Sequence, residues 1–167
     1  MDYLLFKFNK DLITRISCQN EFNIIAFAPK IGKLYKKNEK KSLRKTLFRL
    51  YISLLTFNKT KVYLVTDKNG KVIHTSYTIC RNFKYRFMEK NEILIGPCST
   101  EIEYRGKGIY PYVLNYIINN TNNVNYYLII KPDNNSSIKG AEKAGFEITD
   151  RKINKSKFLN CFIEHKS

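Results

Sequence analysis

In the second half of the chain the sequence passes from a strand pattern to a helix pattern through a short basic loop. Ile93 to Thr100 is apolar enough for a strand, and Ile109 to Asn119 has a helical pattern, with Pro111 tolerated in its first turn. Gly106 and Gly108 let the loop turn sharply, so that several backbone N–H groups face one point beside the positive end of the helix dipole. This arrangement predicts a binding site for phosphate groups.

Two further strands come before this loop and a third follows it. Lys61 to Thr66 and Lys71 to Ile79 are rich in β-branched and aromatic residues and flank Asn69-Gly70, a pair that tolerates positive φ. They predict an antiparallel hairpin. Tyr126 to Ile130 has the composition of a buried strand.

The end of the chain predicts one more helix and two strands. Asn135 or Ser136 is expected to cap a helix that runs to Ala144, and Gly145 is expected to be its left-handed stop. The expected final strands are Phe146 to Ile153 and Phe158 to Ile163.

Ser42 to Leu55 predicts a helix near the N-terminus. Its apolar residues recur at steps of three and four and share one face; they are Leu43, Leu47, Leu50, Tyr51 and Leu54. Arg44, Lys45 and Arg49 lie elsewhere on the helix. We expect the apolar face to dock on the sheet with a solvated basic rim, and the alternative is a helix that lies on a membrane surface. Residues 1 to 40 allow no assignment.

The composition indicates one domain with a large excess of positive charge. The chain has 167 residues, enough for a single core, and 30 Lys and Arg against 14 Asp and Glu give a net charge of +16. This charge attracts anionic ligands, among them nucleic acid, acidic lipid, nucleotide-linked sugars and coenzyme A. Lys, Asn and Ile are all abundant, as in proteins from AT-rich genes, so we interpret the charge as mostly compositional.

The spacing of the cysteines and the length of the apolar runs indicate the cellular compartment of the protein. Cys18, Cys80, Cys98 and Cys161 lie far apart, without the paired spacing of a zinc site, and no secretory signal accompanies them. No apolar run reaches the roughly 18 to 20 residues that span a bilayer. We expect a cytoplasmic protein without a membrane span or a bound metal.

The order of two motifs resembles the GNAT superfamily of acetyl-CoA-dependent N-acetyltransferases over about residues 60 to 150. The first is the Arg/Gln-x-x-Gly-x-Gly/Ala loop, matched by Arg105, Gly108 and, imperfectly, Tyr110. The second is an Asn followed by a short helix that ends in Lys-x-Gly-Phe; its matches are Asn134, Lys143, Gly145 and Phe146. The resemblance implies a mixed α/β fold, with helices on both sides of a mostly antiparallel twisted sheet and a splayed strand pair that forms the cofactor slot.

The resemblance implies acetyl-CoA as co-substrate, with no metal and no covalent enzyme intermediate. The loop amides would bind the pyrophosphate, the strand that ends at Thr100 would face the pantetheine arm, and a backbone N–H there would polarise the thioester carbonyl. The implied cofactor-binding residues are Cys98, Ser99, Thr100, Arg105, Gly106, Lys107, Gly108, Ile109, Tyr110, Asn134, Ser137 and Lys143.

Two positions depart from the family pattern. Tyr110 stands where the first motif usually ends in a small residue, so the cofactor is expected to approach differently there. Many family members carry a tyrosine general acid seven residues after the Asn, and here that position is Ala141. Another side chain or a water must then protonate the leaving thiolate.

Two residues are candidates for the catalytic base. His74 lies in a strand next to the presumed central strand, and an unperturbed imidazole titrates near neutral pH. Glu101 flanks the end of the central strand and is the second candidate, acting through water. The side chain of Cys98 is interpreted as a small strand filler rather than a nucleophile.

The sequence says less about the acceptor of the acetyl group than about the cofactor. The similarity to GNAT proteins encoded with surface-polysaccharide genes suggests an amino sugar or a nucleotide-linked amino sugar as acceptor. Phe83, Tyr85 and Phe87 are expected either to form a platform for the sugar or to pack under a loop. We divide the domain into an acceptor side (1–60) and a cofactor-binding core (61–153), with a homodimer left open. The alternatives are an acetyltransferase for protein or RNA-linked amines and a non-catalytic nucleic-acid-binding protein, although no RNA-binding motif is visible.

Overall fold

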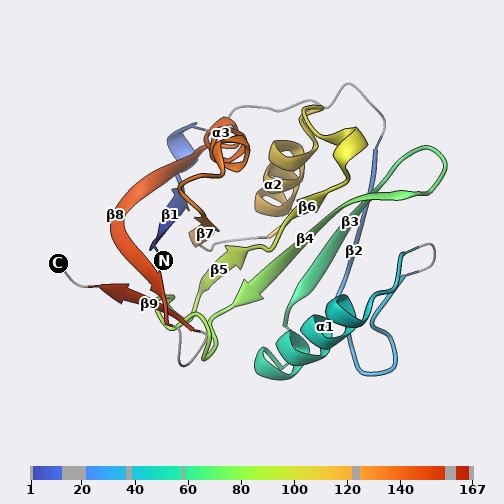
Figure 1. Cartoon of the computed structure of the whole chain (residues 1–167), viewed down its shortest axis with the longest axis horizontal. Helices are drawn as coiled ribbons and strands as arrows, with labels where there is room; N and C mark the ends of the chain where they lie inside the picture. The colour runs from blue at the N-terminus through green and yellow to red at the C-terminus, as the bar shows by residue number, and fades with distance from the viewer. Residues whose placement is uncertain are drawn as a thin grey trace.

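The computed structural model describes residues 2–12, 22–36, 39–57, 59–121, 125–156 and 161–165. In these residues one sheet has the strand order β2-β3-β4-β5-β7-β1-β8-β9, and β6 pairs with β4 beside this path (Figure 1). The strands are β1 (Asp2–Phe8), β2 (Asn23–Phe27), β3 (Lys61–Thr66), β4 (Val72–Cys80), β5 (Glu92–Ile95), β6 (Ser99–Thr100), β7 (Asn125–Ile130), β8 (Phe146–Lys155) and β9 (Phe162–His165). The helices are α1 (Leu43–Leu55), α2 (Ile109–Asn119) and α3 (Asn135–Lys143), with short 3-10 turns η1 (Lys10–Leu12) and η2 (Ile102–Tyr104).

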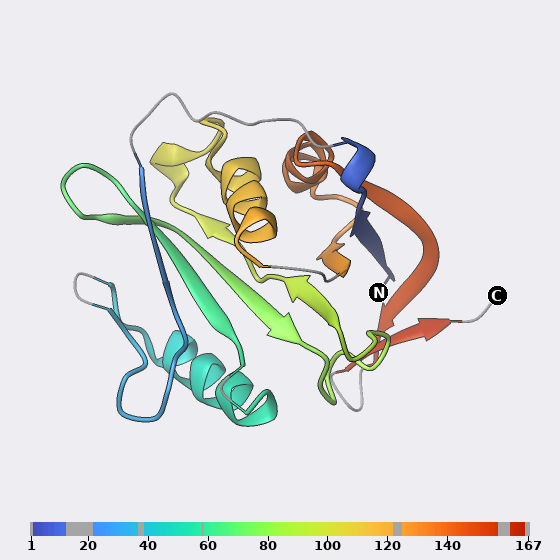
Figure 2. The ribbon, with the colours of Figure 1, turned by 180° about the vertical axis from the view of Figure 1, so that it is seen from behind.

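The sheet carries a hydrophobic core on each face. Side chains alternate along β3, so that Val62 and Leu64 join the cluster that contains Ile52 of α1, whereas Tyr63 joins the cluster formed with α2 and α3. Figure 2 shows the same separation from behind, with α1 away from α2 and α3. Among the strands of the described residues β5 and β7 pair in parallel, and the other strand pairs are antiparallel. The predicted mixed α/β fold, with a mostly antiparallel sheet and helices on both sides, is confirmed.

The strand predicted from Ile93 to Thr100 is interrupted, and this part of the prediction is wrong. β5 pairs in parallel with β7 through residues 92–94, and the chain then bends at Gly96 and Pro97 before β6 pairs with β4. Gly96 has a φ of 147°, and Pro97 has no N–H to donate to a neighbouring strand. As a result β6 is not paired with β7, and the two strands diverge beyond β5.

The turns agree with the local sequence signals, with one correction. Gly70 has a φ of 75° in the β3–β4 turn, and Gly145 has a φ of 83° after α3, as predicted. The cap of α3 is Asn134, not Asn135 or Ser136, because the Asn134 side chain accepts a hydrogen bond from the backbone N–H of Ser137 at 3.2 Å. The second motif therefore begins with the residue that fixes the start of this helix.

Helix α1 forms where expected, but the predicted docking face is wrong. Four of the five predicted apolar residues point to solvent, with exposed fractions of 46 to 77 %, and Leu50 is half-buried; the four are Leu43, Leu47, Tyr51 and Leu54. The buried side of the helix instead carries Arg49, Ile52 and Ser53. The spacing predicted the helix correctly, and the helix packs on the sheet by its more polar side.

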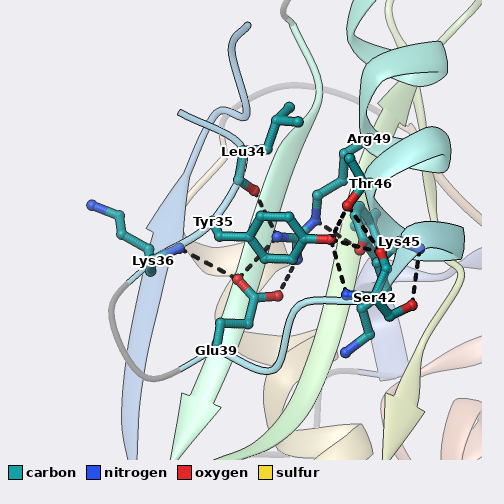
Figure 3. A network of polar contacts seen from close by, with 9 residues as sticks. Leu34, Tyr35, Lys36, Glu39, Ser42, Lys45, Thr46 and Arg49 are labelled. Atoms are coloured by element: carbon teal, nitrogen blue, oxygen red, sulfur yellow. Dashed lines mark hydrogen bonds and ion pairs between the residues drawn. The ribbon is translucent and has the colours of Figure 1, made fainter. Parts of the chain in front are cut away.

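A buried ion pair accounts for this orientation (Figure 3). The Arg49 guanidinium pairs with the Glu39 carboxylate, and both side chains are fully buried. Arg49 also donates to the carbonyl of Leu34 at 2.7 Å and to the hydroxyl of Tyr77 at 3.1 Å. A buried charge needs such partners, so the arginine side of α1 must face the protein.

The two ends of the chain lie together in the sheet. β1 pairs with both β7 and β8, so residues 2–8 share the sheet of the predicted cofactor-binding core. β8 and β9 are antiparallel, but residues 158–160 of the last predicted strand, like Cys18, lie outside the described residues. Within the described part of the chain, no helix is long and apolar enough to cross a membrane.

Candidate functional site

The loop between β6 and α2 has the geometry of an anion-binding nest. Gly106 and Gly108 have φ values of 76° and 74°, which a residue with a side chain rarely adopts. Gly108 is the N-cap of α2, and no side chain caps the helix there. The backbone N–H groups of Gly106, Gly108, Ile109 and Tyr110 have no hydrogen-bond acceptor in the described part of the chain. They are available to an anion, and the helix dipole adds to the attraction.

Neighbouring residues hold the nest loop in place. The Arg105 side chain turns back and donates from Nε to the carbonyl of Thr100 at 3.2 Å. The Tyr104 hydroxyl donates to the carboxylate of Asp67, in the β3–β4 turn, at 2.9 Å. The loop is therefore tied both to β6 and to the hairpin, as a preorganised binding site requires.

A cavity of about 470 Å³ opens over the loop, between β6, α2 and α3. We call it the nest cavity. It is lined by every residue that the motifs implied for cofactor binding except Lys107. These are Cys98, Ser99, Thr100, Arg105, Gly106, Gly108, Ile109, Tyr110, Asn134, Ser137 and Lys143.

Tyr110 places an aromatic side chain in this cavity. It packs against Gly140 of α3 so closely that a Cβ atom on Gly140 would lie 2.6 Å from the Tyr110 ring. Burial, with a smaller contribution from Cys98, raises the pKa of Tyr110 well above its ordinary value. Ala141, at the position where many GNAT proteins carry a tyrosine general acid, is fully buried in the core. The large Tyr110 and the small Gly140 thus fit one another, a pairing that the sequence motifs did not reveal.

His74 lines the nest cavity, and both its ring nitrogens are hydrogen-bonded. Nδ1 lies 2.7 Å from the hydroxyl of Thr100, and Nε2 lies 2.7 Å from the hydroxyl of Ser76. Ser76 in turn donates to the sulfur of Cys98 at 3.2 Å. Burial lowers the pKa of His74 to about 4, and burial raises the pKa of the Cys98 thiol to about 11. The imidazole and the thiol are therefore both neutral near pH 7.

A second cavity, of about 590 Å³, adjoins the first. We call it the α1–β4 cavity, since residues 39–48 and residues 71–77 line most of it. His74 and Ser99 line both cavities, so the two spaces meet at these residues. Glu101, the second candidate base, lines the α1–β4 cavity and not the nest cavity.

The walls of the α1–β4 cavity combine basic and apolar side chains. Phe48, Val72 and Pro97 supply apolar surface, and Glu101 is an acidic residue among the lining. The basic lining residues are Lys40, Arg44, Lys45, Lys71 and Lys84. Burial and the nearby Lys155 lower the pKa of Lys84. This composition suits a molecule with an anionic part and a flat apolar part.

The sequence did not locate this second cavity, because its walls come from segments far apart in the chain. The aromatic residues considered as a sugar platform are mostly packing residues: Tyr85 stacks on Phe162, and Phe87 contacts Tyr127 edge to face. Phe83 is partly exposed under Arg86. Among the described residues no three His, Cys, Asp or Glu side chains lie close enough together to hold a metal ion.

Comparison with known proteins identifies the fold. No protein-family model and no curated protein sequence matches the chain. Among solved structures, a GNAT-family acetyltransferase from Colwellia psychrerythraea is similar with a TM-score of 0.60 and 18% identity, over 89% of this chain and 53% of that one. A putative GNAT acetyltransferase from Novosphingobium aromaticivorans gives a TM-score of 0.55 and 16% identity, over 89% of this chain and 60% of that one.

A tandem GNAT protein from the clavulanic acid biosynthesis pathway is also similar, with a TM-score of 0.52 and 13% identity over 88% of this chain and 50% of that one. The chain spans about half to three fifths of the length of these structures. At such low identity the agreement concerns architecture. The chain has the fold of the GNAT acetyltransferases.

Proposed function

We propose that the chain transfers an acetyl group from acetyl-CoA to the primary amine of an amino sugar, most readily one linked to a nucleotide. The observation that carries this proposal is the pair of adjoining cavities that share His74 and Ser99. One contains a phosphate nest, and the other is basic and partly apolar. Two substrates that bind one in each cavity would meet at the shared residues.

In this proposal the nest cavity holds acetyl-CoA. The amides of Gly106, Gly108 and Ile109 bind the pyrophosphate at the start of α2, and Arg105 and Lys107 add positive charge. The pantetheine arm lies along β6, where the divergence from β7 leaves room. This places the thioester near His74 and Ser99, next to the α1–β4 cavity.

The reaction is a direct transfer. The amine nitrogen attacks the thioester carbonyl, the C–N bond forms, the C–S bond breaks, and the coenzyme leaves as a thiolate that takes up a proton. The Tyr110 hydroxyl supplies this proton, because its ring lines the nest cavity in which the thiolate forms and a tyrosine is protonated near pH 7. General acid help of this kind typically gives about 10² to 10⁴-fold.

The amine must lose a proton before or during its attack. We assign this step to Glu101, whose carboxylate lines the cavity proposed for the amine and acts through a water. The imidazole of His74 is buried and both its ring nitrogens already hydrogen-bond to hydroxyl groups, so we do not assign this step to His74. His74 instead holds Thr100 and Ser76 by hydrogen bonds and so positions β6.

The α1–β4 cavity supports a nucleotide-linked amino sugar as acceptor. Lys40, Arg44 and Lys71 suit a diphosphate, while Phe48 and Pro97 offer apolar surface to a sugar or a base. In the described part of the chain Cys80, Cys98 and Cys161 are free thiols, which supports a reducing compartment such as the cytoplasm. A protein or RNA-linked amine would use the same chemistry with a larger acceptor.

The test is an acceptor screen that follows release of the coenzyme thiol from acetyl-CoA. A nucleotide-linked amino sugar is compared with the same amino sugar without phosphate, with a peptide that has a free N-terminus, and with the N-acetylated sugar nucleotide as a blocked control. We expect the largest kcat/KM for the nucleotide-linked amine. Turnover of the peptide alone would move the proposal to protein amines, and no turnover of any amine would contradict acetyl transfer.

A further inference from the structure

The solvent-facing side of α1 carries an apolar stripe that the proposed reaction does not use. Its residues are Leu43, Leu47, Tyr51, Leu54 and Phe57, which we call the α1 outer face. Phe57 follows the helix with a φ of 49°, a conformation that usually belongs to glycine, and its side chain is 85 % exposed. A soluble helix normally turns such a stripe toward the core.

A turn that packs against α1 carries a further exposed apolar side chain. Ser53 donates to the carbonyl of Pro29 at 3.0 Å, and Arg49 holds the carbonyl of Leu34, so the segment between them lies beside α1. At the tip of this segment Ile31 is 73 % exposed, next to Gly32 with its φ of 84°. The turn therefore lies along α1 and presents another large exposed apolar side chain.

The segment that carries the α1 outer face has exposed charge of one sign. Between residues 22 and 61 the only acidic residue is Glu39, and its carboxylate is fully buried against Arg49 (Figure 3). The exposed charged side chains in the described part of this segment are therefore all positive. Those nearest the apolar residues in sequence are Lys30, Lys33, Lys40, Lys41, Arg44 and Lys59.

We propose that the α1 outer face, together with the Lys30–Lys33 turn, docks on a lipid bilayer that carries anionic headgroups. An apolar stripe flanked by lysine and arginine is the pattern of a helix that lies in a membrane interface, where side chains such as Leu and Phe enter the acyl region and basic residues meet the headgroups. A second copy of the chain fits less well, because it would bring two positive surfaces together on chains of +16 each.

Docking by this face places the α1–β4 cavity close to the bilayer. Lys40 and Arg44 belong both to the basic surroundings of the α1 outer face and to the wall of the cavity. An acceptor whose phosphate is anchored in the lipid could then enter the cavity from the membrane side. This consequence rests on the proposed function, whereas the docking itself does not.

The experiment is co-sedimentation of the full chain with vesicles of phosphatidylcholine, with or without phosphatidylglycerol. The test variant is Leu47→Ser/Leu54→Ser, which alters exposed side chains and leaves the core intact. The matched control is Ile148→Ser, since Ile148 on β8 is 53 % exposed and Leu47 on α1 is 58 % exposed. Urea unfolding and acetyl-CoA titration of each variant, without vesicles, report folding and cofactor binding separately.

We expect the chain to bind the anionic vesicles and to be released by added salt. The double variant should bind them at least about tenfold more weakly, because two leucines no longer enter the bilayer, and Ile148→Ser should bind normally. Absence of vesicle binding, or equal binding by the double variant, would overturn the proposal. So would a dimer in sedimentation that the double variant dissociates, which would assign the face to a second copy. Vesicle binding without acetyl-CoA binding would contradict only the proposed function.

Discussion

The nest loop takes its shape from residues within it, whereas α1 takes its orientation from a partner ten residues away. Gly106 and Gly108 supply the positive φ values, and the start of α2 follows at once. In α1 the apolar spacing marks a helix, but the pairing of Arg49 with Glu39 turns the opposite side inward. Local signals such as glycines therefore predict the backbone conformation directly. The face that a helix buries depends instead on which side chain, here the Arg49 guanidinium, needs a partner of opposite charge.

The largest expected effect concerns the ion pair that orients α1. Arg49→Met should lower the free energy of unfolding by about 3 to 5 kcal/mol, because it leaves the Glu39 carboxylate buried without a partner. Urea unfolding measures this change, with the exposed Lys41→Met as control. Replacing both partners, Arg49→Met/Glu39→Met, should recover most of the loss. A double variant as unstable as the single one would show that the pair does not act as a unit.

The second expectation concerns His74, at the junction of the two cavities. Burial lowers its folded-state pKa from 6.5 to about 4, so between these pH values the unfolded state binds a proton that the folded state does not. The free energy of unfolding should therefore fall as the pH decreases through this window, by on the order of 3 kcal/mol in total. His74→Asn should remove this part of the pH dependence in urea unfolding. An unchanged slope in the variant would contradict the assignment.

The third expectation separates chemistry from binding in the nest cavity. Tyr110→Phe keeps the ring against Gly140 but removes the hydroxyl, so kcat should fall by about 100-fold while the Kd for acetyl-CoA stays the same. Tyr112→Phe, on the same helix, is the control and should retain activity. If Tyr110→Phe retains full kcat, the proton reaches the thiolate from another group.

The smallest expected effect tests the fit between α2 and α3. Gly140→Ala places a Cβ 2.6 Å from the Tyr110 ring and should cost about 1 to 3 kcal/mol, since the two helices cannot easily separate. In a Tyr110→Ala background the same substitution should cost much less. Urea unfolding of the natural chain, Gly140→Ala, Tyr110→Ala and the double variant gives the coupling free energy between the two positions. Equal costs in both backgrounds would mean that the contact is relieved by other movements.

The sequence predicted most of what local signals control. Helix α2, the hairpin around Gly70 and the stop at Gly145 all follow from glycine, proline and the apolar spacing. The break at Gly96 and Pro97 was missed because the apolar residues around it continue the strand pattern. Its consequence, the divergence of β6 from β7, appears only once the strands are paired.

Prediction from the sequence failed where segments far apart in the chain come into contact. The α1–β4 cavity joins residues 39–48 to residues 71–77 and to Pro97, Ser99 and Glu101, and no spacing in the sequence marks that contact. The burial that lowers the pKa of His74 has the same origin, since Thr100 of β6 and the ring of Tyr110 lie next to the imidazole. A histidine in a predicted strand does not by itself indicate a lowered pKa.

The central claim is that the nest binds the pyrophosphate of acetyl-CoA, and a calorimetric titration tests it most directly. Gly108→Glu puts a carboxylate and a strained φ in the nest, and Gly32→Glu is the matched control, because Gly32 has a φ of 84° and, like Gly108, open space around its Cβ position. We predict saturable binding of acetyl-CoA to the natural chain and to Gly32→Glu, and none to a folded Gly108→Glu variant. Equal binding by both variants, or no binding by the natural chain, would contradict the account.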